Sequence, residues 1–281
     1  MGNQMKHIAG YLDHIHYSGP LAPTFDTLYQ LHLQHTQSIP FENLSSFTGT
    51  EVRLGIPALL EKFTVAKRGG YCFEQNAVFQ YVLEQIGFKT IGLAARVRLN
   101  VADDVTTPRS HMLLLVEADG EQWIADTGFG GMTLTVPIRF AVNEIQNTPH
   151  GQYRLTHERE FYRLEARIKN EWTVLYIFDL TAHYPVDYVV YNWYVSTHPS
   201  SHFVTSLIAA RPVKAGRHVL NGTQYSYYPL VGEAEKTQLG SVDEIRGVLE
   251  EIFHIRTADV VGLDERLERL ISDAGSEISL R

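Results

Sequence analysis

The segment Arg68-Gly69-Gly70-Tyr71-Cys72-Phe73-Glu74-Gln75-Asn76 contains the only cysteine of the 281-residue chain. Cys72 follows a glycine pair and opens an amphipathic segment that runs to Ile86, with Gly87 placed for a left-handed helix cap. The unpaired N–H groups and the positive dipole end of a helix favour a thiolate at such a position. Since a lone cysteine is more commonly a small buried apolar residue, Cys72 needs a base and an acid beside it to be a candidate nucleophile.

A predicted hairpin supplies that base and acid. Asp119-Gly120 lies between two β-type runs and predicts a two-residue turn in which Ala118 faces Glu121. In this register His111 and Asp126 project from the same face of the sheet, within reach of each other. A loop with an odd number of residues would place them on opposite faces. We therefore predict His111 as the base for Cys72 and Asp126 as the carboxylate that orients it.

The hairpin ends in the glycine-rich stretch Asp126-Thr127-Gly128-Phe129-Gly130-Gly131. These glycines would let the backbone approach a ligand and offer N–H groups to phosphate or to a developing oxyanion. Thr133 stands where a dinucleotide-binding fingerprint has its third glycine, and no phosphate-loop or His-Glu-x-x-His motif occurs. We predict no metal site, and we interpret four histidines as solvated helix positions: His14, His16, His32 and His35.

Composition limits the function classes. The chain has 24 basic and 32 acidic side chains and a formal charge of −8, whereas nucleic-acid binders usually carry a basic stripe. Apolar runs such as 112–116 and 204–210 fall far short of the roughly 20 residues that span a bilayer. The first residues show no signal-peptide pattern. We expect no nucleic-acid or membrane partner and a cytoplasmic protein.

Hydrophobic periodicity divides the chain into three expected units. Residues 1–86 predict a helical bundle that carries Cys72, with helices near Lys6 to Tyr17, after Thr24, and from Pro57 and Cys72 onward. Residues 87–195 predict a β-rich domain with strands at Ile91 to Leu99, His111 to Glu117, Gln122 to Asp126, Gln152 to Leu155, Phe161 to Ile168 and Trp172 to Phe178.

Residues 196–281 predict an α/β unit. Its expected strands are Phe203 to Ala209, His218 to Leu220 and Gln224 to Pro229, followed by a helix opened by the capping box at Ser241 and a last helix near Leu263 to Ile271. No linker separates the three units, which are therefore expected to pack tightly. The predicted fold class is α+β.

The segment around Cys72 resembles the active-site signature of the arylamine N-acetyltransferases, acetyl-CoA-dependent enzymes with a Cys-His-Asp triad. Three further segments support the resemblance in the family's order and spacing: Ile39 to Leu44, Asp126 to Gly130, and Asn192 to Phe203. The similarity covers essentially the whole chain, and Thr127 replaces the valine that is common in the family. It implies a helical bundle, a β-barrel-like middle domain and an α/β lid around a transglutaminase-like core.

The resemblance also implies residue roles. Cys72 would be the nucleophile, His111 its base and Asp126 the orienting acid, while Glu42 and Arg68 would form an ion pair that holds the cysteine loop. The coenzyme would pass along Gly128, Phe129, Gly130 and Gly131. The acceptor pocket would be lined by Phe41, Phe129 and Phe203, for which plain core packing is the alternative.

The implied reaction is ping-pong transfer of acetyl from acetyl-CoA, a co-substrate rather than a tightly bound cofactor, to an arylamine or hydrazine, with O-acetylation of N-hydroxyarylamines as an extension. The alternatives are a cysteine hydrolase or amidase, an amide synthase that releases or cyclises a polyketide chain, and a non-catalytic binding protein with this fold. Motifs specify neither the physiological amine nor the oligomeric state.

Overall fold

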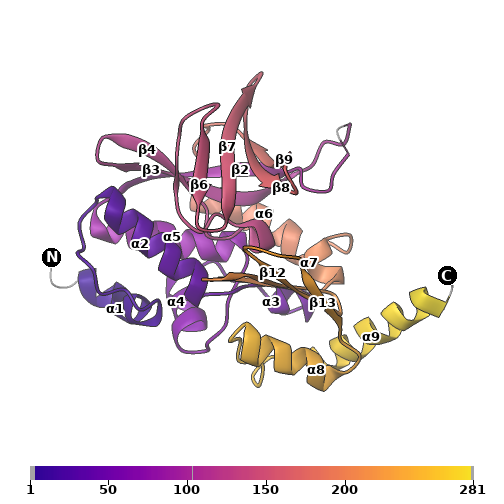
Figure 1. The fold of residues 1–281 in the computed structure, drawn as a ribbon. Coiled ribbons are helices and arrows are strands. Elements are labelled where there is room, and N and C mark those ends of the chain that lie inside the picture. Colours follow the sequence, from indigo (N-terminus) through magenta and orange to yellow (C-terminus); the bar gives the residue numbers. More distant parts are fainter. Residues whose placement is uncertain (1–3, 103, 280–281) are drawn as a thin grey trace.

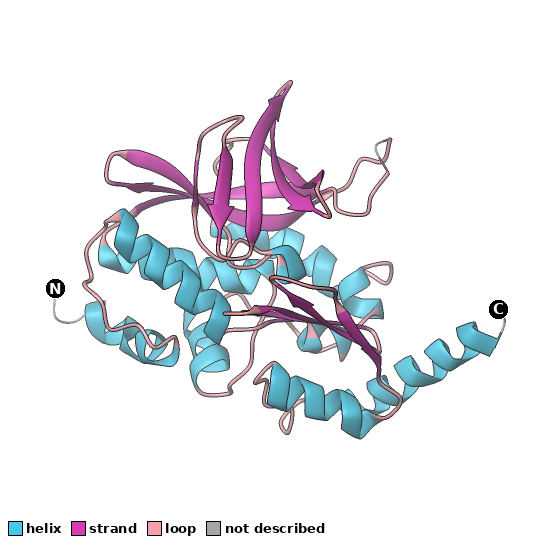
Figure 2. Ribbon diagram, viewed as in Figure 1, coloured by secondary structure: helices cyan, strands magenta, loops and turns pink. Residues whose placement is uncertain are grey.

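The computed structural model describes residues 4–102 and 104–279. Most helices and a smaller sheet form one half of the molecule, and a strongly curved larger sheet stands on that half (Figure 2). The longer helices are α1 (Gln4–His14), α2 (Phe25–Ser38), α4 (Ile56–Thr64), α5 (Cys72–Ile86), α6 (Pro185–Thr197) and α9 (Leu263–Ser279). Short helical turns are α3 (Leu44–Phe47), η1 (Gly130–Met132), α7 (His202–Thr205), α8 (Val242–Gly247) and η2 (Val248–Ile252).

The larger sheet has eight antiparallel strands and curls into a nearly closed, barrel-like layer above α2, α5 and α6 (Figure 1). In spatial order the strands are β5 (Ile138–Arg139), β4 (Glu121–Ala125), β3 (Arg109–Ala118), β2 (Lys89–Val97), β9 (Glu171–Phe178), β8 (Phe161–Ile168), β7 (Gly151–Glu158) and β6 (Ile145–Thr148). The register shifts between Ala95 and Arg96 and between Leu164 and Glu165. Such bulges bend strands and help the sheet to close.

A second sheet connects the first residues of the chain with the last third. Its order is β1 (Phe41–Glu42), β10 (Ile208–Val213), β11 (Gly216–Asn221), β12 (Gln224–Pro229) and β13 (Glu235–Gln238). Phe41 pairs with Ala210, so a strand of the helical region forms one edge of this sheet. Leu220 of β11 and Phe253 after η2 are buried in one core with residues of α8 and α9, which lie against the sheet (Figure 1).

The predicted α+β class and the critical hairpin are both confirmed. Asp119 and Gly120 have φ angles of 51° and 79°, as a tight hairpin turn of this twist requires, and Ala118 faces Glu121. Gly87 caps α5 with φ 107°.

The first half of one predicted strand is helical, so that part of the prediction is wrong. The run from Phe203 to Ala209 begins as α7, because the Ser201 hydroxyl accepts a hydrogen bond from the N–H of Phe203 and caps a helical turn. The strand starts only at Ile208. Helix α6 was not predicted, and residue 195 lies inside it. The division into 1–86, 87–195 and 196–281 stays a prediction. Within the described ranges, no helix is long and apolar enough to cross a membrane.

Candidate functional site

Cys72 is the first residue of α5 and lies beneath the curved sheet. Its side chain is almost completely buried, and Sγ lies 3.6 Å from the backbone oxygen of Ser110. The Glu74 side chain accepts a hydrogen bond from the N–H of Tyr71 at 3.1 Å and so fixes the turn that opens the helix. The turn before Cys72 and helix α5 after it therefore fix the position of the cysteine, at the positive end of the helix.

His111 and Asp126 meet as the hairpin register predicts. The distance from His111 Nε2 to Asp126 Oδ2 is 2.7 Å, and both residues are buried. Since Nε2 is engaged by the carboxylate, Nδ1 is the ring nitrogen left for the Cys72 thiol. The structure thus brings together the three side chains singled out from the sequence, from α5, β3 and the end of β4.

The environment favours a protonated His111 beside an ionised Asp126. Burial by itself lowers the pKa of His111, but the charge and hydrogen bond of Asp126 and the interaction with Cys72 outweigh it and raise the pKa to about 10. Burial raises the pKa of Asp126, and the neighbouring imidazole with two hydrogen-bond donors reverses this and lowers it below its usual range. The imidazole of His111 is therefore protonated at neutral pH.

Asp126 is held by more groups than the sequence suggests. Its Oδ2 also accepts a hydrogen bond from Tyr176 at 2.9 Å, while Oδ1 accepts from Asn76 and from the N–H of Gly128, each at 3.0 Å. Asn76 lies one helical turn after Cys72, a spacing that could have identified it. No sequence signal identifies Tyr176, because it reaches the site from β9 through the tertiary fold.

The glycine-rich stretch contacts the cysteine directly. A Cβ placed on Gly128 would lie 2.7 Å from the Cys72 Cα, so only glycine fits there. Its N–H is donated to Asp126, and the N–H of Phe129 is donated to Thr133 at 3.1 Å. The N–H of Gly128, one of the glycines expected to offer an N–H group to a ligand, is therefore used within the turn. Gly130 has φ 76°.

Ion pairs fix the loop that precedes the cysteine. Arg68 Nη2 lies 2.7 Å from Glu42 Oε1, and Lys62 Nζ lies 2.6 Å from Glu74 Oε1. Glu42 also accepts the N–H of Leu44 at 2.6 Å. Burial raises the pKa of Glu42, but Arg68 and Lys62 outweigh it and lower the pKa. Glu42 is therefore an anion that ties Arg68, in the loop before the cysteine, to the segment that begins at Leu44.

Two histidines interpreted as solvated helix positions are fully buried, and that interpretation is wrong for them. His32 accepts a hydrogen bond from the backbone N–H of Asp126 at 3.1 Å. His35 joins the Tyr11 hydroxyl at 2.6 Å and Gln75 Oε1 at 2.5 Å. Burial lowers the pKa of His32 to about 4 and that of His35 to about 3, so both are neutral near pH 7. Periodicity missed them because tertiary contacts bury them: His32 lies against Asp126 at the end of β4, and His35 is bonded to Tyr11 of α1 and Gln75 of α5.

The three predicted pocket phenylalanines divide into two places. Phe41 and Phe203 have ring centroids 6.1 Å apart, and Phe203 also lies 5.2 Å from the ring of Tyr71. Phe129 packs edge-on against His111 with centroids 5.0 Å apart. The ring of Phe41 comes within 3.5 Å of a Cβ built on Gly130, so the two aromatic groups meet at the glycine-rich turn.

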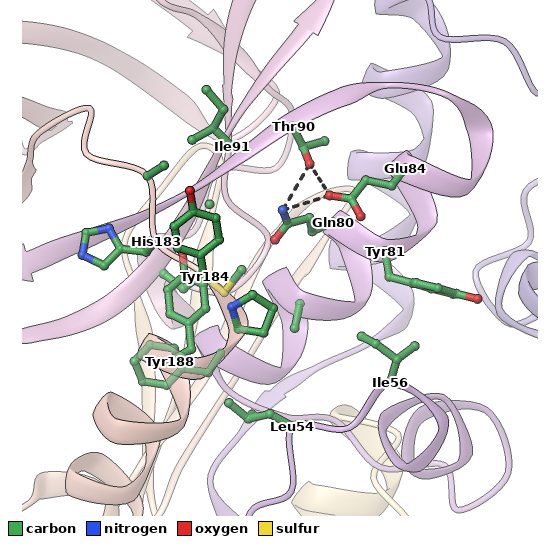
Figure 3. Close-up of a pocket in the computed structure, with 16 residues that line it drawn as sticks. Leu54, Ile56, Gln80, Tyr81, Glu84, Thr90, Ile91, His183, Tyr184 and Tyr188 are labelled. Atoms are coloured by element: carbon green, nitrogen blue, oxygen red, sulfur yellow. Dashed lines mark hydrogen bonds between the residues drawn. The ribbon is translucent and has the colours of Figure 1, made fainter.

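A separate cavity of about 550 Å³ lies beside α5 (Figure 3). Phe73 and Met112, the chain neighbours of Cys72 and His111, line it, but the three site residues themselves do not. Its polar wall is a hydrogen-bonded set in which Thr90 and Gln80 both donate to Glu84 (Figure 3). The cavity borders the site without containing it.

No group of three or more His, Cys, Asp or Glu side chains that could hold a metal ion occurs in the part of the chain that the structure describes.

Known proteins that resemble this chain belong to one class of enzyme. A family model described as N-acetyltransferase matches residues 24–260. The arylamine N-acetyltransferase of Escherichia coli (strain K12) is 40% identical over 250 residues, which cover 89% of each chain. The arylamine N-acetyltransferase / N-hydroxyarylamine O-acetyltransferase of Salmonella typhimurium is 38% identical over 251 residues, again 89% of each.

A solved structure agrees. The structure of Mycobacterium marinum arylamine N-acetyltransferase in complex with CoA superimposes with a TM-score of 0.90 at 37% identity, covering 94% of this chain and 99% of that one. The chain belongs to the arylamine N-acetyltransferase family and is an enzyme of the acyltransferase class.

Proposed function

We propose that the enzyme transfers the acetyl group of acetyl-CoA to arylamines and hydrazines through an acetyl-cysteine at Cys72. The observation that carries the proposal is the hydrogen-bonded His111–Asp126 pair beside a cysteine at the start of a helix. That arrangement turns a thiol into a nucleophile. The names of the relatives support the acceptor class, including N-hydroxyarylamines for O-acetylation, and the CoA complex of a relative supports the donor.

The first half-reaction moves one proton and one acyl group. His111 holds the proton that the Cys72 thiol gives up, and the sulfur anion attacks the thioester carbonyl of acetyl-CoA. The bond between the acetyl carbon and the coenzyme sulfur breaks, and the imidazolium returns the proton to the leaving thiolate. Asp126 keeps the ring oriented throughout.

The second half-reaction reverses the roles. The amine nitrogen attacks the acetyl-cysteine, and the neutral His111 accepts the proton that the nitrogen loses. The carbon–sulfur bond breaks and Cys72 leaves as the anion beside the imidazolium. Arylamines and hydrazines suit this step because they are largely neutral at pH 7 and keep a free lone pair.

The remaining roles rest on position. We assign the coenzyme path to Gly128, Phe129, Gly130 and Gly131, and the acceptor pocket to Phe41, Phe129 and Phe203. The meeting of the Phe41 ring with Gly130 supports a common channel for both ligands. We also assign Glu42 and Arg68 to support of the cysteine loop and expect the enzyme to act in the cytoplasm, with acetyl-CoA as a passing co-substrate.

The test separates transfer from hydrolysis. Incubation with acetyl-CoA alone should add one acetyl group to the peptide containing Cys72, and a later addition of an arylamine should remove it and yield the acetylated amine. Asp126→Asn should slow the first step by roughly 10³-fold or more, because the amide cannot hold the imidazolium.

Cys72→Ala serves as the matched blank. Acetyl transfer by this variant would contradict the proposal, and so would an acetyl-enzyme that water discharges as fast as an amine does. Acylation only by carrier-bound thioesters, with no reaction of acetyl-CoA, would favour an amide synthase instead.

A further inference from the structure

A basic depression lies behind the cysteine loop. It has a volume of about 810 Å³ and is lined from the ends of α1, α2 and α4, from β10 and from the loop after η2. An adjoining depression of about 540 Å³ shares part of its lining and reaches Arg68. The basic and imidazole side chains that line the larger depression are His14, His16, Lys67, Arg211 and His254.

Arg211 is the least compensated of these groups. It is partly buried, its Nε has no hydrogen-bond partner among the described residues, and burial lowers the pKa of its guanidinium with no carboxylate to offset the effect. Burial and the charge of Arg211 also lower the pKa values of His254 and His218. A partly buried cation without an anion is costly unless an anion binds it.

The imidazoles respond to the same excess of positive charge. Burial, Lys67 and His16 together lower the pKa of His14 to about 4. The acidic side chains that line the two depressions are Asp13 and Glu250, and Glu250 is hydrogen-bonded to Thr257. Positive charge therefore gathers here in a chain whose formal charge is −8.

The backbone at this surface is that of three helix ends. His16, Lys67 and His254 have φ angles of 60°, 52° and 59°, the left-handed region that usually takes glycine. Each such residue costs of order 1 kcal/mol relative to ordinary backbone. His16, Lys67 and His254 follow the ends of α1, α4 and η2, where a left-handed residue commonly ends a helix, so helix termination explains this conformation.

Part of the cluster has a simpler explanation. Cations near helix C-termini offset the negative end of the helix dipole, which accounts for Lys67 after α4. It does not account for Arg211, which comes from a strand and whose Nε has no hydrogen-bond partner in the described part of the chain.

We propose that this depression binds a phosphate dianion. The ligand chemistry has two possible sources: free inorganic phosphate or a phosphate monoester, and the phosphate groups of the coenzyme. The inference goes beyond acetyl transfer, because phosphate binding does not require Cys72. Lys67 directly precedes the loop that contains Arg68 and Cys72, so an anion bound there would contact the segment that positions the nucleophile.

Calorimetric and thermal titration with inorganic phosphate tests the site, with chloride at equal ionic strength as the reference. Phosphate should raise the Tm of the wild-type protein in a concentration-dependent way. Arg211→Gln should weaken binding at least about tenfold, and Lys67→Gln, at an exposed position that can be changed without disturbing the core, should also weaken it. Lys214→Gln removes the same charge from an exposed turn and should bind as the wild type does.

Proton uptake provides a second readout. Binding near pH 7 should take up protons, seen as a dependence of the heat on the buffer's ionisation enthalpy, because an anion raises the pKa values of the neighbouring imidazoles. A Tm shift no larger than with chloride, or equal shifts in wild type and Arg211→Gln, would overturn the proposal. If the cations serve helix ends only, Lys67→Gln would lower the Tm but leave the phosphate shift unchanged.

Competition with coenzyme A distinguishes the two sources. Displacement of phosphate by coenzyme A would assign the site to the coenzyme's phosphates, and simultaneous binding would assign it to a separate phosphate ligand. Cys72→Ala should retain phosphate binding, so that failure of the proposed transfer and failure of this site give different results.

Discussion

Asp126 organises the site at the scale of single residues. Its two oxygens accept hydrogen bonds from His111, Tyr176, Asn76 and the N–H of Gly128, and none of the carboxylate is exposed. Hydrogen bonds to an ionised group favour that form, so the carboxylate stays charged although it is buried. A buried anion in turn keeps a proton on the imidazole. The chemistry of the site therefore depends on donors that do not react.

Gly128 allows a prediction at the same scale. Gly128→Ala should destabilise the protein by about 1–3 kcal/mol and abolish acetylation, because the new Cβ would lie 2.7 Å from the Cys72 Cα and must push the turn away from α5. Urea unfolding and acetyl incorporation measure the two effects.

Gly131→Ala is the matched control. Its Cβ would first meet a side-chain carbon of Val219 at 3.3 Å, which can shift by a few tenths of an ångström. It should keep near-native stability. Equal losses of stability in the two variants would show that the close approach at Cys72 is not the cause.

At the scale of elements, α5 connects the helical region with the curved sheet. Cys72 and Asn76 share one face, and Asn76 donates a hydrogen bond to the backbone oxygen of Met112 on β3 at 2.7 Å. On an adjacent face Gln75 donates to the backbone oxygens of Pro40 and Gly70 at 2.8 and 3.1 Å. Helix α5 thus fixes the positions of the cysteine, the loop before it and the strand that carries His111, relative to one another.

The ion pair of the cysteine loop gives an element-scale prediction. Arg68→Met should lower the free energy of unfolding by about 3 kcal/mol. It leaves the buried Glu42 carboxylate with the N–H of Leu44 and with Lys62 Nζ, at 3.9 Å, as its remaining cation among the described residues. Loss of the ion pair that holds the cysteine loop should also slow acetylation of Cys72. Urea unfolding at pH 7 measures the first effect.

Arg53→Met is its control, because Arg53 pairs with Glu51 at the surface, where both side chains are more than two-thirds exposed. Surface pairs contribute little, so this variant should unfold as the wild type does. A comparable loss in both variants would contradict a special role for the buried pair.

At the scale of the whole molecule, buried histidines limit stability on both sides of neutral pH. The pKa of His111 is raised to about 10, so its contribution is complete below about pH 6.5 and is lost as the pH rises toward 10. The pKa values of His32 and His35 are lowered to about 4 and 3, so their contribution is present above about pH 6.5 and is lost as the pH falls toward those values.

We therefore expect the free energy of unfolding to be greatest near pH 6–7. Urea denaturation across the pH range measures it, with His111→Gln as a comparison. The stability difference between wild type and this variant should shrink between about pH 7 and 10. A constant difference over that interval would show that His111 has the same pKa in the folded and unfolded states.

The sequence determined much of this protein by itself. The turn at Asp119-Gly120 fixed the hairpin register, and with it the meeting of His111 and Asp126, because a two-residue turn leaves strand pairing no freedom. The α+β class, the start of α5 at Cys72 and its cap at Gly87 also follow from local patterns. Local geometry and periodicity are encoded by neighbours in the chain, so they can be read from the sequence.

Only the tertiary structure decided the surroundings of these residues. Tyr176 reaches Asp126 from a strand 50 positions away. His32 is buried against the end of β4, and His35 is buried between α1 and α5. Arg211 joins Lys67 and His254 only after three distant segments pack together. Burial and long-range partners depend on which surfaces meet, and no local pattern specifies that. Burial and long-range contacts therefore determine the charge state of the site residues, whereas local sequence patterns identify which residues form the site.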